Sequence, residues 1–228
     1  MTHREHTLEV INRVRQHTDS VILFYSAGKD SIALLDLIAP HFKRVVCVFM
    51  YLVPDLDHIN KYIEYSKIKY PNAEFHQVPH WNLTYILRAG LYCQPQPGVK
   101  LMKFCDVAEN CRLRFGIEYC FYGMKQSDNM NRRVMLRGKD YELEAIQTKT
   151  KNVYPLSRWG NNEVKAYIKQ QRLPMPITYS RSQKSQGLIF CESTFLYLRE
   201  HYPQDLQKIY AAFPFSEQIL FKYDNQNK

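Results

Sequence analysis

Short apolar runs in the first half of the chain constrain the fold more than any other feature of the sequence. Residues 21–25 (VILFY) and 44–51 (RVVCVFMY) are typical of strands that are buried on both faces of a parallel sheet. Between them, apolar residues recur at helical spacing from Ile32 to Ile38, and Pro40 ends this segment. A strand, a helix and a second strand in this order predict a βαβ unit.

The alternation of strands and helices continues along the chain and then changes character. We expect helices at 5–16, 57–69, 81–89 and 106–115, and strands at 73–78 and 118–122. Further helices are expected at 161–172, 191–202 and 205–212, followed by a frayed tail from Asp224. The pattern predicts a Rossmann-like three-layer α/β/α fold with a parallel sheet. We place an α/β domain at 1–158 and a helical C-terminal extension packed on it at 159–228.

The chain is basic, with 31 Lys and Arg against 22 Asp and Glu and a formal net charge of +9. This surplus favours a polyanionic ligand such as a nucleotide, RNA or DNA. The basic residues are scattered, which argues against a dedicated nucleic-acid-binding tail. No apolar run approaches the roughly 20 residues of a membrane span, and no signal peptide is evident. We therefore expect a cytoplasmic protein without a membrane partner, whose six cysteines are reduced.

A polar loop with anion-binding chemistry, residues 26–31 (SAGKDS), lies between the first strand and the helix that follows it. Unpaired backbone N–H groups and the helix dipole favour an anion at such a helix N-terminus. Gly28 allows a sharp turn and a close approach to a phosphate. The loop also offers hydroxyl groups, an ammonium and a carboxylate, which would bind phosphate oxygens, hold Mg²⁺ or orient Lys29. The spacing of the kinase and GTPase P-loop is absent.

This loop resembles the S-G-G-K-D-S loop of the ATP-pyrophosphatase (PP-loop) superfamily, with Ala27 replacing one glycine. The resemblance implies an adenine nucleotide alpha hydrolase-like fold that binds ATP. In that superfamily ATP is usually cut between its α and β phosphates. The AMP moiety then activates a substrate, and pyrophosphate leaves.

Two further segments resemble the branch of this superfamily that contains PAPS reductase and the small subunit of ATP sulfurylase. Residues 123–132 (GMKQSDNMNR) are similar to its G-x-R-x-x-E-S-x-x-R signature, with Lys125 and Asp128 replacing Arg and Glu and with Arg132 kept. An ordinary basic helix face is the competing interpretation of this segment. Residues 153–159 (VYPLSRW) resemble its PL-x-x-W segment, where we expect Trp159 to be a packing anchor. The resemblance extends over residues 15–175.

The resemblance implies a set of site residues and ligands. The residues expected to act in catalysis are Lys29, Asp30, Lys125 and Arg132, and Asp30 is also the expected Mg²⁺ ligand. The residues expected to contact the nucleotide are Ser26, Ala27, Gly28, Lys29, Asp30, Ser31, Tyr51 and Gly123. The acceptor is expected to be an anionic small molecule or a nucleic-acid-linked group, in sulfur metabolism or nucleic-acid modification. The sequence leaves open whether the protein has a protein partner and whether it forms a homodimer.

Departures from the reductase pattern leave two other functions open. The first is reduction of PAPS or APS. Two features argue against it: the C-terminal E-C-G-x-H segment of the reductases is missing, and the Lys29-Asp30 pair favours ATP. The second is a nucleotide- or nucleic-acid-binding module without turnover. No CxxC pair occurs, so an iron–sulfur cluster is not expected. The sequence also leaves open a thiolate site of Cys93, Cys105, Cys111 and Cys191, a sulfur-carrying Cys105 or Cys191, and a loop at 178–185 whose Arg181 and Lys184 close over the phosphates.

Overall fold

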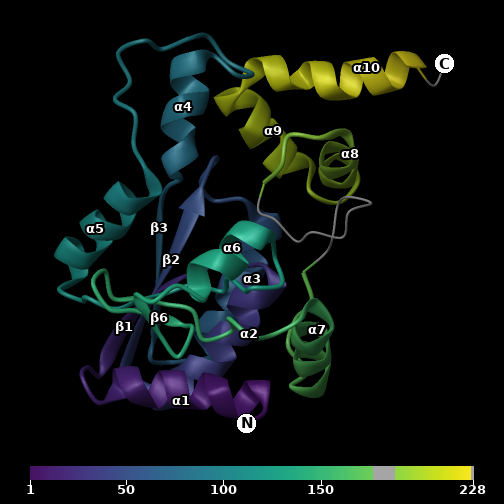
Figure 1. The fold of residues 1–228 in the computed structure, drawn as a ribbon. Coiled ribbons are helices and arrows are strands. Elements are labelled where there is room, and N and C mark those ends of the chain that lie inside the picture. Colours follow the sequence, from purple (N-terminus) through teal and green to yellow (C-terminus); the bar gives the residue numbers. More distant parts are fainter. Residues whose placement is uncertain (177–187, 227–228) are drawn as a thin grey trace. The chain divides into compact units, whose positions relative to one another are not determined.

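The computed structural model describes residues 1–176 and 188–226 (Figure 1). These residues fall into two compact units. The first unit contains residues 1–49, 66–76 and 108–176. The second contains residues 50–65, 77–107 and the C-terminal part from residue 177. This division differs from a single boundary after residue 158, because residues 159–176 belong to the first unit and two earlier segments belong to the second.

A seven-stranded sheet with the order β3-β2-β1-β4-β7-β6-β5 forms the centre of the fold. Its strands are β1 (Ser20–Phe24), β2 (Arg44–Tyr51), β3 (Ala73–Pro79), β4 (Cys120–Phe121), β5 (Tyr141–Glu142), β6 (Ile146–Gln147) and β7 (Asn152–Val153). Strands β2, β1, β4 and β7 run parallel, while β6 is antiparallel to both β7 and β5. The sheet is therefore mainly parallel, and the predicted three-layer α/β/α class is confirmed.

The direction in which successive strands are added to the sheet reverses at β1 and β4. Ile22 of β1 lies opposite Val46 of β2 on one side and opposite Cys120 of β4 on the other. The chain leaves β1 for β2, and only later returns to add β4 on the opposite side of β1. Neighbouring parallel strands whose connections leave in opposite directions form a topological switch point, where open α/β sheets bind ligands.

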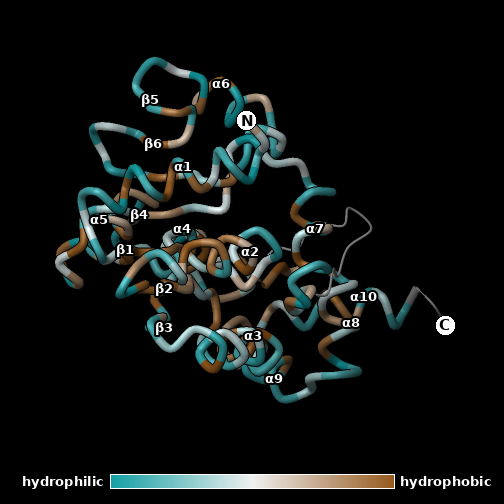
Figure 2. The backbone as a smooth tube through the Cα atoms, turned by 90° about the horizontal axis from the view of Figure 1, so that it is seen from below, coloured by the Kyte–Doolittle hydropathy of each residue, from teal (hydrophilic) through white to brown (hydrophobic). Residues whose placement is uncertain are grey.

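The first unit has its hydrophobic core on the two faces of β1. Val21, Ile22 and Leu23 are fully buried, as the unbroken apolar run predicts for a central parallel strand. Helix α2 (Lys29–Ile38) follows β1 and buries nearly all of its apolar side chains. Figure 2 shows hydrophobic stretches along β1, β2 and α2. This burial fixes where α2 begins, and hence where the loop before it lies.

Helices α1 (His3–Arg15) and α7 (Asn161–Gln170) are tied to the first unit by buried polar contacts. The indole Nε1–H of Trp159 donates to the Thr7 hydroxyl at 2.9 Å, and its ring packs edge-on against Tyr167. The Tyr167 hydroxyl in turn donates to Asp36 of α2 at 2.6 Å. Trp159 is buried in this arrangement, where it packs against both helices.

The second unit is mainly helical. It contains α4 (Trp81–Ala89), α8 (Glu192–His201), α9 (Pro203–Ala212) and α10 (Gln218–Gln226), with parts of α3 (Asp57–Lys69) and α5 (Phe104–Phe115). Asp205 of α9 caps the start of α3, because its carboxylate accepts the backbone N–H groups of Asp57 and His58 at 2.8 and 2.9 Å. The C-terminal helices thus satisfy donors that α3 cannot pair internally.

Several elements differ from the sequence-based expectation. The predicted strand at 118–122 is reduced to Cys120–Phe121, and α6 (Met130–Leu136) and β5–β7 were not predicted. Two-residue strands are too short to show an apolar period. The frayed tail expected from Asp224 is wrong in part, because α10 extends to Gln226. The loop at 178–185 lies outside the described residues. Among the described residues, no helix has the length and apolarity needed to cross a membrane.

Candidate functional site

The SAGKDS loop follows β1 and includes the first turn of α2, which begins at Lys29. Gly28 is the residue before α2 and has an extended conformation, with a φ of −86°. The turn itself is made by Ala27, whose φ is 55°. This corrects the expectation that Gly28 makes the turn. Left-handed backbone is unfavourable for alanine, and Ala27 is the position where the superfamily motif has a glycine.

Two serines hold this loop in shape. Ser31 donates through Oγ to the carbonyl oxygen of Gly28 at 2.9 Å and accepts the backbone N–H of Ser26 at 3.2 Å. The hydroxyl groups of Ser26 and Ser31 also lie 3.2 Å apart. Ser31 is buried, so its hydroxyl group supports the loop from inside.

Gly123, which follows β4, lies directly against the start of α2. A Cβ atom on Gly123 would lie 3.2 Å from both the carbonyl carbon and the Cβ of Asp30, and 3.3 Å from the backbone nitrogen of Ser31. The glycine therefore allows the segment after β4 to approach the phosphate loop closely. The two segments that resemble the superfamily motifs meet at the switch point of the sheet.

An alternating chain of charges links the two segments. Asp30 contacts two ammonium groups, with Oδ2 at 2.6 Å from Lys29 Nζ and Oδ1 at 2.7 Å from Lys125 Nζ. Lys125 also lies 2.9 Å from Asp128 Oδ1, and Asp128 in turn pairs with Arg132. Lys125 is fully buried, and its Nζ makes no well-directed hydrogen bond among the described residues, so its contacts are ion pairs.

Asp128 is the ionised carboxylate that lies between Lys125 and Arg132 in this series of ion pairs. Burial on its own raises the pKa of the Asp128 carboxyl, but the interactions with Lys125 and Arg132 outweigh burial and hold the pKa below its usual value. Asp128 also accepts the backbone N–H of Lys125 at 2.9 Å. Asn129 then caps α6 by accepting the backbone N–H of Arg132, which places Arg132 on the first turn of that helix.

The remaining predicted residues are Tyr51 and the cysteines. Tyr51 is the last residue of β2 and belongs to the second unit. Cys93 and Cys111 are buried, Cys105 is exposed, and all are free thiols. Within the described ranges, no group of three or more His, Cys, Asp or Glu side chains is arranged to hold a metal ion.

Cys191 has a distinct environment in the second unit. It stands immediately before α8, with Sγ 3.2 Å from Thr194 Oγ1 and 3.4 Å from Ser193 Oγ. Burial raises the pKa of the Cys191 thiol, but hydrogen bonds from the side chains and backbones of Ser193 and Thr194 lower it further than burial raises it. The net effect favours the thiolate, which is the nucleophilic form.

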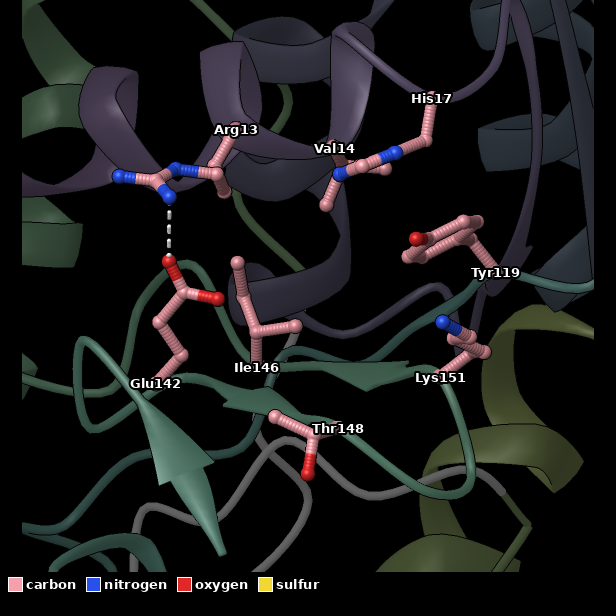
Figure 3. Close-up of a pocket in the computed structure, with 8 residues that line it drawn as sticks. All are labelled: Arg13, Val14, His17, Tyr119, Glu142, Ile146, Thr148 and Lys151. Atoms are coloured by element: carbon pink, nitrogen blue, oxygen red, sulfur yellow. Dashed lines mark ion pairs between the residues drawn. The ribbon is translucent and has the colours of Figure 1, made fainter.

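A small pocket of about 100 Å³ lies elsewhere in the first unit (Figure 3). Arg13 and Glu142 face each other across it as an ion pair at 2.9 Å. Its lining residues are Arg13, Val14, His17, Tyr119, Glu142, Ile146, Thr148 and Lys151. Tyr119 precedes β4 and Lys151 precedes β7, whereas the phosphate loop follows β1. The pocket is therefore at the amino ends of the strands and is not part of the phosphate-loop site.

The fold and the two motif segments define the class of protein: an α/β nucleotide-binding protein whose anion-binding loop follows the first strand. The model of the family described as "Phosphoadenosine phosphosulfate reductase domain" matches residues 20–193 of the chain. The chain belongs to this family, and with it to the PP-loop, adenine nucleotide alpha hydrolase-like superfamily. No curated protein sequence matches the chain.

Solved structures support the same fold. The phosphoadenylyl-sulfate reductase of Candida auris, in a phosphate complex, has a TM-score of 0.50 and 14% identity, over 75% of this chain and 81% of the other. The U34-tRNA thiolase NcsA of Methanococcus maripaludis, with its [4Fe-4S] cluster, has a TM-score of 0.52 and 15% identity, over 95% of this chain and 78% of the other. At these identities the likeness concerns the fold.

Proposed function

We propose that this protein binds ATP at the SAGKDS loop and cleaves it between the α and β phosphates, forming an adenylyl group and pyrophosphate. The observation that carries the proposal is the meeting of this loop with the segment after β4 at the switch point of the sheet, where Gly123 packs on Asp30. Membership in a PP-loop family supports the choice of an adenine nucleotide.

The cations of the site have distinct proposed roles. Lys29 and the backbone N–H groups at the start of α2 bind the β and γ phosphates, since a helix N-terminus favours an anion. Lys29 transfers from Asp30 to the phosphates on binding. Arg132 is partly exposed and binds the α phosphate, because a guanidinium can contact two phosphate oxygens at once. Catalysis is then mainly positioning and electrostatic stabilisation of the developing charge.

Asp30, the expected Mg²⁺ ligand, has both carboxylate oxygens paired with ammonium groups in this arrangement. A metal ion bound directly to Asp30 would therefore compete with Lys29 or Lys125 for the carboxylate. Once Lys29 has moved to the phosphates, Asp30 Oδ2 becomes accessible to the ion. When bound, Mg²⁺ would supply charge neutralisation at the phosphates.

The acceptor is proposed to be an anionic small molecule or a nucleic-acid-linked group. The net charge of +9 suits either acceptor. The structurally similar tRNA thiolase illustrates the second type of substrate on the same fold. The sulfur chemistry of the family makes activation before sulfur transfer the reaction class that we favour.

A second candidate function is thiol-dependent reduction of a sulfonucleotide. It is favoured by the family description and by Cys191, whose thiol pKa is lowered at the start of α8. It requires a cysteine to attack the sulfonucleotide, so replacing a single cysteine would abolish it. The Lys29-Asp30 pair of the loop favours ATP instead.

The deciding experiment uses ATP labelled at the α phosphate, with PAPS tested separately. Wild-type protein is expected to release labelled AMP or an adenylated product together with pyrophosphate, and Lys29→Ala is expected to abolish this. Lys43→Ala is the matched control, because Lys43 is an exposed lysine of the same unit that pairs with Asp19. Turnover of PAPS with indifference to ATP would support the reductase, and nucleotide binding without any product would support a binding module.

A further inference from the structure

Lys125 is a buried cation that the sequence analysis places among the residues expected to act in catalysis. Its side chain has no solvent exposure and lies between the carboxylates of Asp30 and Asp128. An ammonium group in the interior is stable only when it is paired. Lys125 would have to leave both carboxylates to touch a nucleotide, which makes direct substrate contact unfavourable.

The position of Asp30 gives Lys125 another role. Asp30 lies on the first turn of α2, next to the backbone N–H groups that are proposed to bind phosphate. A carboxylate at this point repels a polyphosphate and also competes with it for Lys29. Lys125 neutralises Asp30 from the buried side, while Lys29 lies on the other oxygen.

We propose that Lys125 is a positioning residue: by pairing with Asp30 it weakens the hold of Asp30 on Lys29, so that Lys29 can transfer to the phosphates of ATP. This inference rests on the function proposed above. Without Lys125, Asp30 keeps its full charge beside the loop and retains Lys29. The contact between Lys29 and the β and γ phosphates is made both in the bound substrate and in the transition state. Its loss therefore raises KM and leaves kcat nearly unchanged.

A direct catalytic role for Lys125 predicts the opposite kinetic pattern. If the ammonium group stabilised charge at the α phosphorus, its removal would lower kcat with little change in KM. For the positioning role, we expect Lys125→Met to raise the KM for ATP about tenfold, the scale of one charge-assisted contact. Lys125→Arg keeps the cation and is expected to retain most of the wild-type KM.

The double variant Asp30→Asn/Lys125→Met makes the test independent of a general loss of structure. With the Asp30 carboxylate gone, Lys125 has only Asp128 left to neutralise, so its removal in the Asp30→Asn background is expected to leave the KM for ATP unchanged. The comparison stays informative if Lys125→Met alone does not fold, because the double variant removes Asp30 together with Lys125 and leaves Asp128 paired with Arg132.

The experiment is steady-state pyrophosphate release with ATP and Mg²⁺ for the wild type and the four variants, with circular dichroism to confirm folding. A rise in KM for Lys125→Met that is absent in the Asp30→Asn background supports the proposal. A fall in kcat alone, or an equal loss in both backgrounds, overturns it. Absence of ATP turnover in the wild type would instead count against the proposed function, which keeps the two failures distinct.

Discussion

The Cα of Gly123 faces Asp30 so closely that a Cβ on Gly123 would lie 3.2 Å from the Cβ of Asp30. This approach joins the segment after β4 to the phosphate loop after β1. It also brings the ammonium group of Lys125 within ion-pair distance of Asp30. The geometry of the site therefore depends on a position without a side chain, and this dependence can be tested directly.

Gly123→Ala is expected to destabilise the protein by about 1–3 kcal/mol, as overpacking of a tight contact does. The atoms that a Cβ would meet include backbone atoms of Asp30 and Ser31, which cannot rotate away. Thermal unfolding and ATP binding would be measured on the same samples. Gly98→Ala is the control, because a Cβ there meets nothing within 4 Å. Equal stability of the two variants would contradict the close-packing argument.

Ala27→Gly is expected to stabilise the protein slightly, by up to about 1 kcal/mol, because the left-handed conformation of Ala27 costs alanine more than glycine. Ala33→Gly provides the contrast: Ala33 lies buried inside α2, where glycine is expected to destabilise by about 1 kcal/mol or more. Urea unfolding of both variants measures the difference. Destabilisation of the same size at both positions would show that the loop does not strain Ala27.

Acid is expected to destabilise the protein through His6. This residue is fully buried, with Nε2 2.7 Å from the carbonyl oxygen of Leu143, and its Nδ1 has no partner among the described residues. Burial lowers the pKa of His6, and the contact with Leu143 only partly offsets this. The unfolded chain then binds more protons, so the free energy of unfolding falls as the pH drops below about 6.5.

The contribution of His6 can be separated by substitution. His6→Gln keeps a donor for Leu143 and cannot titrate, so it is expected to reduce the loss of stability between about pH 7 and about pH 5. Chemical denaturation at several pH values gives this slope, and His201→Gln, at an exposed histidine, serves as the control. A slope that is unchanged by His6→Gln would exclude His6 as its source.

Cys191 is expected to react with iodoacetamide at neutral pH faster than the exposed Cys105, because hydrogen bonds at the start of α8 lower the pKa of its thiol. Thr194→Val removes one of these hydrogen bonds and is expected to slow the reaction. Mass spectrometry of the alkylated peptides distinguishes the two cysteines. If Thr194→Val does not change the alkylation rate of Cys191, the hydrogen bonds do not control the reactivity of its thiol.

The fold class and most of the elements could be predicted from the sequence because each depends on local pattern. The apolar run at 21–25 predicts a strand that is buried on both faces, and residues 21–24 of β1 are buried as predicted. Helices α3 and α4 and strand β2 have the predicted bounds. The motif segments also predicted the family, because their spacing is continuous in the sequence.

Other features depended on residues that are distant in the sequence. Lys125 was expected to act in catalysis, and the sequence does not show that its ammonium group is buried against Asp30, which lies far earlier in the chain. Gly123 was expected to contact the nucleotide, and the structure places it against the first turn of α2. Strands as short as β5, β6 and β7 have no period of their own and exist because neighbouring backbone groups pair with them.

The sequence by itself therefore determined the strand–loop–helix unit and the chemistry of the residues in it, since both follow from local hydrophobicity and side-chain type. Only the tertiary structure decided which charges neutralise one another and which remain able to meet a ligand. The physical reason is that the strength of a charge interaction depends on burial and distance. Burial and distance are set when β4 pairs beside β1 and brings Lys125 to Asp30.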